Sequence, residues 1–296
     1  MKEIISVDNF DVNKSVESFI DFLDVDLDTI RSYKSRIEVF INYLQENNIT
    51  NPNRNHIKMF RDELKGKKSA NTINSYMTAL RQFFKYLESR GLYNNVTENV
   101  KSLKTSKVAK TQVLTSEQCK TIYNSLTDKR EKAMWSLAIT TGMRVNEIVN
   151  SKLENIKVHN GEIVLFHICK KRSDESEYNK LSQSVLQDIL DYVGERNSGY
   201  IFVSESNHNR GNGITPTTAR RIVKGILKRF GIEADWVSCH TLRRTSATLA
   251  YLNGKSIYDI KQYLHHASIS TTSRYIQQVT RDTNNTENVL SDLLLG

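Results

Sequence analysis

Apolar side chains recur at intervals of three and four residues through the first hundred positions, which is the spacing of amphipathic helices. Four such stripes are present, and the clearest covers residues 73–87. Ser69 and Asn71 are both suitable N-caps for this stripe, and Gly91 follows its end. Four amphipathic helices with short connections favour a compact bundle, which we place at residues 1–93.

The helical pattern ends near residue 94, and lysines accumulate from there to residue 112 with no acidic residue after Glu98. Residues 94–112 are therefore predicted to form an extended basic linker. Such a linker could follow a phosphate backbone between two domains, whereas a solvated hinge explains the charge equally well. Its basic side chains are Lys101, Lys104, Lys107 and Lys110.

Residues 113–280 combine helical patterns with short runs of β-branched and aromatic residues, which predicts a mixed α+β domain. Two strands joined by a polar turn are expected at residues 162–169 and 177–181, and a shorter strand at 200–203. A capping box, Thr115 to Gln118, precedes the first helix. Further helices are expected at residues 129–141, 216–230, 241–252, 256–264 and 270–279, and others begin near residues 145 and 184. The chain is thus mainly α with a small β-sheet.

The net charge of +9 comes from 42 basic and 33 acidic side chains and is unevenly distributed. Residues 1–30 contain eight acidic and two basic side chains, so the rest of the chain has an excess of fifteen basic ones. Such a surface attracts nucleic acid, or else serves only solubility. No apolar run approaches the roughly 18 residues that cross a bilayer, and three widely spaced cysteines are a poor disulfide framework. We therefore expect a cytoplasmic protein without membrane association.

Arg144 follows Gly142 and precedes a predicted helix, where free backbone N–H groups and the helix dipole favour an anion. Its guanidinium could donate two hydrogen bonds to phosphate oxygens, or it could simply pair with Glu147.

Histidines and arginines cluster near the C-terminal end. His240 shares a predicted helix face with both Arg243 and Arg244, and spacing alone does not choose between the two arginines. Paired histidines at positions 265 and 266 precede Tyr275. These histidines and Cys239 lack the short ligand spacing of a zinc site, so we expect no bound metal.

The order of these groups resembles the tyrosine recombinase family, also called phage integrases. Three blocks carry the resemblance: residues 141–148 (TGMRVNEI), residues 240–243 (HTLR) and residues 264–275 (LHHASISTTSRY). The resemblance implies an N-terminal four-helix core-binding domain, a linker and a mixed α+β catalytic domain that together clamp DNA.

By this resemblance Tyr275 attacks the scissile phosphate, leaving a 3′-phosphotyrosyl enzyme and a free 5′-hydroxyl. Arg144 and Arg243 would bind the non-bridging oxygens, a task that suits bidentate guanidinium groups. His240 would move the tyrosine proton, and His266 would hydrogen-bond the phosphate. No metal or other cofactor is implied, because the phosphotyrosine bond retains the energy of the broken linkage.

A hairpin lysine that protonates the leaving 5′-oxygen is also implied. The stretch at residues 169–172 (CKKR) matches a family pattern of Gly-Lys-Gly and a basic run, with both glycines replaced. This register favours Lys170, and a turn shifted by one residue would favour Lys171. Arg244 stands where a histidine often follows the family's arginine. His265 replaces a frequent glycine and is an alternative to His266 as the phosphate ligand.

DNA contacts are expected from basic side chains outside the catalytic blocks. The candidates for phosphate contacts are Lys101, Lys104, Lys107, Arg220, Arg221 and Lys224, and those for the major groove are Arg81 and Lys85. Residues 281–296 form a tail with a short apolar helical face, which docks either on a neighbouring protomer or on its own domain.

Together these features predict a site-specific recombinase or integrase of a bacterium, phage or mobile element. It would act as a homotetramer on double-stranded DNA recombination sites. A type IB topoisomerase-like relaxation enzyme and a catalytically silent DNA-binding accessory protein are the alternatives. The target sequence, the direction of recombination and any accessory proteins cannot be inferred from these motifs.

Overall fold

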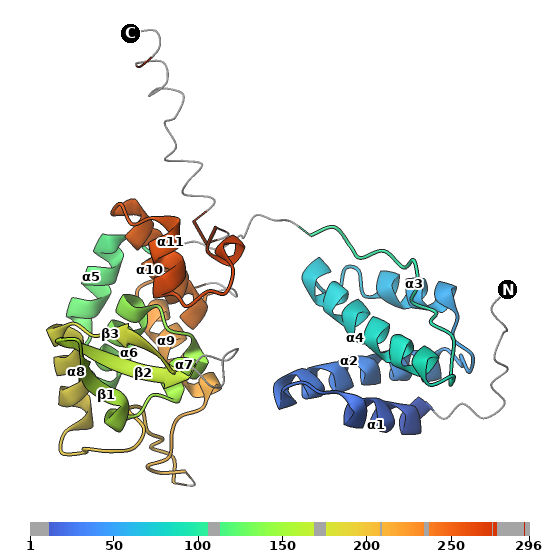
Figure 1. Cartoon of the computed structure of the whole chain (residues 1–296), viewed down its shortest axis with the longest axis horizontal. Coiled ribbons are helices and arrows are strands. Elements are labelled where there is room, and N and C mark those ends of the chain that lie inside the picture. Colours follow the sequence, from blue (N-terminus) through green and yellow to red (C-terminus); the bar gives the residue numbers. More distant parts are fainter. Residues whose placement is uncertain are drawn as a thin grey trace. The chain divides into compact units, whose positions relative to one another are not determined.

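The computed structural model describes residues 12–105, 113–168, 176–207, 209–233, 237–273, 275–276 and 293. The chain divides into two compact units, Met1–Lys107 and Val108–Gly296 (Figure 1). Each unit has a hydrophobic core of its own.

The described part of the first unit is a helical bundle. Its helices are α1 (Val12–Phe22), α2 (Leu27–Glu46), α3 (Arg54–Glu63) and α4 (Ala70–Ser89). The side-chain oxygens of Asp26, Asn53 and Ser69 accept hydrogen bonds from the first turns of α2, α3 and α4. Ser69 is therefore the cap of α4, and Asn71 already lies inside that helix. α2 packs on α4 and α1 packs on both, which confirms the predicted bundle.

Aromatic side chains fill the centre of this bundle. Phe19, Phe40, Phe83 and Phe84 are all almost completely buried. The ring centroids of Phe19 and Phe83 are 5.5 Å apart, as are those of Phe83 and Phe84, and both pairs meet edge to face. The aromatic members of the helical stripes are thus core residues, as their spacing predicts.

The backbone of residues 99–103, which follow α4, is held against the first unit by hydrogen bonds from side chains of that unit. The fastening side chains are Arg54, Arg61, Arg81 and Asn74, which bond the backbone of Asn99, Lys101, Val100 and Leu103 at 2.8 to 3.1 Å. Residues 99–103 therefore follow a fixed path, so a solvated hinge does not describe this part of the predicted linker. The side chains of Lys101 and Lys104 point into solvent.

The second unit is organised around α6 (Lys129–Thr141), which packs against four other helices of the unit. Trp135 on α6 is completely buried in the core. The remaining helices are α5 (Ser116–Ser125), α7 (Val145–Val149), the short 3₁₀ helix η1 (Leu153–Asn155), α8 (Gln183–Val193), α9 (Pro216–Arg229), α10 (Cys239–Leu252) and α11 (Ile257–Tyr263). No helix in the described part of the chain is long and apolar enough to cross a membrane.

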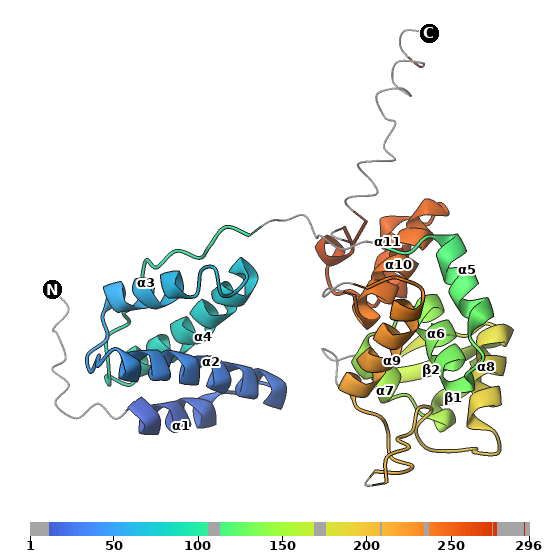
Figure 2. The same ribbon diagram turned by 180° about the vertical axis from the view of Figure 1, so that it is seen from behind.

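Three antiparallel strands form the sheet of this unit in the order β1, β2, β3. They are β1 (Ile156–His159), β2 (Glu162–Ile168) and β3 (Ser176–Lys180). Figure 1 views the unit with this sheet in front, and Figure 2 views it from behind, with α9 in front. The pairing of β2 with β3 confirms the predicted hairpin. β1 was not predicted: its residues alternate between apolar and polar, but the run is only four residues long and three of the four are exposed.

The strand predicted at residues 200–203 is wrong. Tyr200 and Val203 make only isolated bridges to Lys152 and Gly213. The run is apolar because Ile201 and Phe202 are fully buried in the core of the unit. A short buried loop and a short buried strand have the same composition, so periodicity could not separate them.

Candidate active site

The turn between α6 and α7 places Arg144 beside an open cleft. Gly142 ends α6 with a φ of 60°, a left-handed conformation that glycine adopts without strain. A Cβ atom at this position would lie 2.8 Å from Cδ2 of Leu264 and 2.9 Å from Oγ of Ser246. Both the backbone conformation and the close packing therefore require glycine two positions before Arg144.

A buried carboxylate holds Arg144 in place. The backbone N–H of Arg144 donates to Oε2 of Glu147 at 2.7 Å, and its guanidinium donates to Oε1 at 2.8 Å. Burial acts to raise the pKa of Glu147, but the hydrogen bonds from Arg144 outweigh it and leave that pKa below its ordinary value. Glu147 is thus a charged residue of the site that fixes the position of Arg144. The amino-acid sequence suggested only that it could form an ion pair with Arg144.

Arg243 joins three segments of the second unit. Its side chain is 1% exposed. Nη1 donates to the carbonyl of Gly142 at 2.6 Å, and Nη2 donates to the carbonyl of Leu264 at 2.5 Å. Nη1 also lies 4.0 Å from Oε2 of Glu147. The α6–α7 turn, α10 and the end of α11 therefore meet at this guanidinium.

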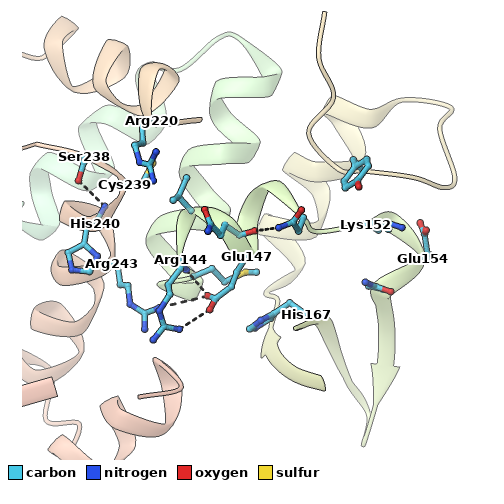
Figure 3. Close-up of a pocket in the computed structure, with 16 residues that line it drawn as sticks. Arg144, Glu147, Lys152, Glu154, His167, Arg220, Ser238, Cys239, His240 and Arg243 are labelled. Carbon is cyan, nitrogen blue, oxygen red and sulfur yellow. Dashed lines mark hydrogen bonds and ion pairs between the residues drawn. The ribbon is translucent and has the colours of Figure 1, made fainter. Parts of the chain in front are cut away.

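The cleft beside these arginines has a volume of about 820 Å³. Its lining includes Arg144, Glu147, Arg220, His240 and Arg243. Figure 3 shows the side chains of Arg144, Glu147 and Arg243 converging, with His240 beside Arg243 on α10. Of the two adjacent arginines on α10, Arg243 is the one that lines this cleft. The arrangement combines fixed cationic donors with a titratable imidazole, which suits a phosphate group.

The side chain of Tyr275 contacts three other side chains, those of His240, His266 and Arg244. Its hydroxyl oxygen is 2.9 Å from Nε2 of His240. Its ring meets the ring of His240 edge to face with centroids 5.3 Å apart, and that of His266 with centroids 5.2 Å apart. Cζ of Arg244 lies 5.6 Å from the ring centroid. The structure thus brings Arg144, His240, Arg243, His266 and Tyr275 together from three separate stretches of sequence.

Both histidines beside Tyr275 are neutral at pH 7. Loss of solvent and the nearby charge of Arg243 lower the pKa of His240 and of His266 to about 4. A neutral His240 can accept a hydrogen bond from the phenol. Nδ1 of His266 lies 2.8 Å from Oγ1 of the buried Thr272, which fixes the imidazole ring.

His265 bonds to the sheet instead of to Tyr275. Its Nδ1 lies 3.1 Å from Oε2 of Glu177 on β3, and its ring centroid lies 5.3 Å from that of His167 on β2. Its φ of 49° is in the left-handed region, which a glycine would adopt without strain. The geometry favours His266 over His265 as the imidazole next to Tyr275.

The other predicted residues lie in several places. Exposed side chains are those of Lys85, Lys101, Lys104, Arg220, Arg221 and Lys224. Arg81 is half-buried and donates to the carbonyl of Val100 at 2.8 Å and to Oγ of Ser102 at 3.1 Å. Lys107 and the two hairpin candidates, Lys170 and Lys171, lie outside the described residues. The tail at residues 281–296 also lies outside them, apart from Leu293.

Two polar residues of the site were missed in the sequence. Thr272 orients the imidazole of His266. On β3, the Oδ1 atom of Asn179 lies 2.7 Å from Nε2 of His167. Thr272 belongs to a recognisable block, so its position was a usable signal, whereas nothing near Asn179 in the sequence marks it. Among the described residues no group of three or more His, Cys, Asp or Glu side chains is arranged to hold a metal ion.

A sequence model of the phage integrase family matches residues 112–281, which include every catalytic candidate. The chain belongs to the phage integrase family. A second model, of the phage integrase N-terminal SAM-like domain, matches residues 16–91. These matches confirm the resemblance drawn from the three sequence blocks.

Curated members of this family include tyrosine recombinases with clear similarity to the chain. It is 30% identical over 183 residues to tyrosine recombinase XerA of Pyrococcus horikoshii, covering 60% of this chain and 62% of that protein. It is 29% identical over 283 residues to tyrosine recombinase XerC of Herpetosiphon aurantiacus, covering 89% of this chain and 90% of that protein. Against XerD of Listeria monocytogenes the chain spans only about half of the relative's length, 49%.

Solved structures of DNA complexes have the same fold. A lambda integrase tetramer bound to a Holliday junction is similar with a TM-score of 0.74, 17% identity, and coverage of 92% of this chain and 78% of that chain. A post-cleavage complex of XerH with its difH substrate is similar with a TM-score of 0.70, 18% identity, and coverage of 95% and 91%. At such identities the likeness concerns the fold alone.

Proposed function

We propose that this protein is a site-specific recombinase that cleaves and rejoins DNA strands through a 3′-phosphotyrosyl intermediate. The observation that carries the proposal is the 2.9 Å contact between the Tyr275 hydroxyl and Nε2 of His240, beside the cleft that Arg144 and Arg243 line. A nucleophile, a base and two phosphate-binding cations are then present at one place.

The two arginines would bind the non-bridging oxygens of the scissile phosphate. Negative charge builds up on these oxygens as the phosphorus becomes five-coordinate, and fixed guanidinium groups stabilise it. Arg243 is held by Gly142 and Leu264 and Arg144 by Glu147, so neither side chain has to be ordered when DNA arrives.

Strand cleavage would start when His240 accepts the proton of the Tyr275 hydroxyl. The phenol oxygen forms a bond to phosphorus, and the bond from phosphorus to the 5′-oxygen breaks. The strand is left joined to Tyr275 through its 3′-phosphate. Rejoining reverses the same steps, with a 5′-hydroxyl as the attacking group and Tyr275 as the leaving group.

The leaving 5′-oxygen needs a proton, and we assign this step to Lys170, with Lys171 as the alternative. His266 would complete the site by donating a hydrogen bond from Nε2 to the phosphate, because Thr272 already occupies Nδ1. The positive charges of the arginines lower the pKa of His240 in the free protein. The negative charge of a bound phosphate would offset them and raise that pKa, so His240 would be a stronger base in the complex.

Exposed basic side chains on both units would hold the duplex. We propose phosphate contacts for Lys101, Lys104 and Lys107 of the linker and for three residues of α9, Arg220, Arg221 and Lys224, with Lys85 facing the major groove. Arg81 would act on DNA indirectly, since its guanidinium secures the backbone between α4 and Lys101.

The working assembly is proposed to be a homotetramer on two double-stranded sites, in the cytoplasm. The lambda integrase structure, which is a tetramer bound to a Holliday junction, supports this by fold. The tail at residues 281–296 would either link neighbouring protomers or cover its own unit.

Recombination is favoured over the two alternatives by the same similarities. The related proteins are named recombinases and integrases, and none of those described above is a topoisomerase. A DNA-binding protein without catalytic activity would not need a Tyr275 hydroxyl that is hydrogen-bonded to the neutral His240. Nor would it need the buried Arg243 and the half-buried Arg144 beside this pair.

Covalent selection tests the proposal and identifies the target sequence in the same experiment. The protein is incubated with nicked duplexes that carry a randomised core, and DNA attached to denatured protein is isolated and sequenced. We expect a defined sequence to be enriched, with no adduct in Tyr275→Phe. Absence of any adduct from the unmodified protein, or an adduct that survives Tyr275→Phe, would contradict the proposal. Efficient relaxation of unrelated supercoiled plasmid would favour the topoisomerase alternative.

A further inference from the structure

Arg244 on α10 is a buried cation that the proposed mechanism does not use. Its side chain is 8% exposed, and its Nε has no hydrogen-bond partner among the described residues. Burying a charge is unfavourable unless another group compensates for the lost water. The ring of Tyr275 is such a group, because its centroid lies 5.6 Å from Cζ of Arg244.

The contact complements the one that His240 makes. Arg244 follows His240 by four residues, so the two side chains leave the same face of α10. His240 holds Tyr275 at its hydroxyl, whereas Arg244 lies over its ring. Burial lowers the pKa of Arg244, as expected for a cation with little access to water.

We propose that Arg244 is a positioning residue, which holds the Tyr275 ring by a cation–π interaction and so directs the hydroxyl toward His240 and the scissile phosphate. This inference rests on the proposed function of Tyr275. It concerns a feature of this particular chain, because similar sequences often have a histidine here, which carries no permanent charge. A ring fixed before DNA binds raises the rate of attack without changing the affinity for DNA.

Two variants separate charge from packing. Arg244→Met keeps a long unbranched side chain without charge, and Arg244→Lys keeps a cation. The probe is the nicked duplex recovered by covalent selection, and the measurements are the single-turnover rate of adduct formation at saturating protein and the Kd for DNA. We expect Arg244→Met to slow adduct formation by about tenfold with an unchanged Kd, and Arg244→Lys to retain most of the rate.

A merely structural arginine predicts the opposite order, because methionine is buried more easily than lysine. Arg244→Met would then be both faster and more heat-stable than Arg244→Lys, and that result overturns the proposal. A wild-type rate in Arg244→Met overturns it as well. If only the Kd rises and the salt dependence of binding becomes flatter, Arg244 is a phosphate contact and the proposal is wrong.

A matched control is Lys132→Met, which removes the cation 4.8 Å from the ring centroid of Tyr123, outside the cleft lining, and should leave the rate unchanged. If Arg244→Met does not fold, Arg244→His at pH 8 makes the same comparison with a neutral imidazole. Slow adduct formation in that variant supports the proposal, and the wild-type rate overturns it.

Tyr275→Phe distinguishes the failure of this inference from that of the proposed function. An adduct in Tyr275→Phe, or none in the unmodified protein, refutes the function and the inference together. An adduct that needs Tyr275 but forms at the normal rate in Arg244→Met refutes the inference alone.

Discussion

The hydroxyl of Tyr275 and Nε2 of His240 lie 2.9 Å apart within one chain. Under the proposed mechanism the nucleophile and its base therefore belong to the same protomer. Cleavage does not require a neighbouring subunit to deliver the tyrosine. A subunit can still control the reaction by moving the segment that carries Tyr275, since this residue lies in a separate stretch from α10.

Replacing His240 with glutamine tests the proton transfer. The amide can hydrogen-bond the phenol but cannot accept its proton, so we expect the adduct-formation rate to fall by about a hundredfold with little change in DNA affinity. Single-turnover cleavage of the nicked duplex measures the effect. His159→Gln, at an exposed position on β1, is the control and should react normally. An unchanged rate in His240→Gln would rule out its role as the base.

Acid should destabilise the second unit through its two neutral histidines. The pKa of His240 and that of His266 fall from 6.5 to about 4 on folding, so the unfolded chain binds more protons between these values. Stability is therefore lost as the pH falls through this range. Both tryptophans, Trp135 and Trp236, belong to this unit, so urea unfolding followed by their fluorescence should have a lower midpoint at pH 5 than at pH 7.

The matching variant for this pH dependence is His266→Gln. It removes one of the two titrating groups, so the difference between the midpoints at pH 5 and pH 7 should shrink. An equal difference in the variant would mean that other groups cause the acid sensitivity.

Gly142→Ala should be one of the most damaging small substitutions. The new methyl group would meet Leu264 and Ser246 at 2.8 and 2.9 Å, in a backbone conformation that alanine avoids. We expect a loss of roughly 2 kcal/mol or more in the free energy of unfolding, together with slower cleavage because Arg243 bonds this carbonyl. Gly231→Ala is the control, since its φ is 71° but nothing lies within 4 Å of its Cβ position, and it should cost only about 1 kcal/mol.

His265 combines backbone strain with a contact to Glu177, and two substitutions separate these contributions. His265→Ala loses the contact and keeps the left-handed backbone, whereas His265→Gly loses the contact and relieves the strain. Urea unfolding should show His265→Gly more stable than His265→Ala by about 1 kcal/mol. Equal stabilities would indicate that the strain at φ 49° is not significant.

Basic side chains on the two units should set the salt dependence of DNA binding. A variant with alanine at Lys101, Lys104, Arg221 and Lys224 should bind all duplexes more weakly. Its plot of log affinity against log salt should be flatter by about 0.9 per lost contact, or roughly 3 to 4 in total. Lys120→Ala and Lys157→Ala, also at exposed positions, serve as controls. An unchanged slope in the fourfold variant would remove these residues from the interface.

Local patterns predicted much of the secondary structure. The helix expected at residues 129–141 is α6 with the same bounds, and the Thr115 capping box is present with both of its hydrogen bonds. These features depend on contacts between residues a few positions apart, which sequence spacing determines directly. β1 was missed although the Asn160-Gly161 turn that joins it to β2 is a local signal for a hairpin. The strand predicted at residues 200–203 is wrong, because whether a short apolar run pairs as a strand depends on neighbours distant in the chain.

The chemical groups of the site, and the family to which they belong, were determined by the sequence alone, because residue identity and spacing within short blocks carry that information. Only the tertiary structure decided how the groups divide their tasks. It buried Arg243 between two carbonyl groups, turned His265 toward Glu177 and placed Arg244 over the Tyr275 ring. Adjacent residues on a helix or turn point in different directions, and their partners come from segments up to about a hundred residues away. Those contacts follow from packing, which no local pattern records.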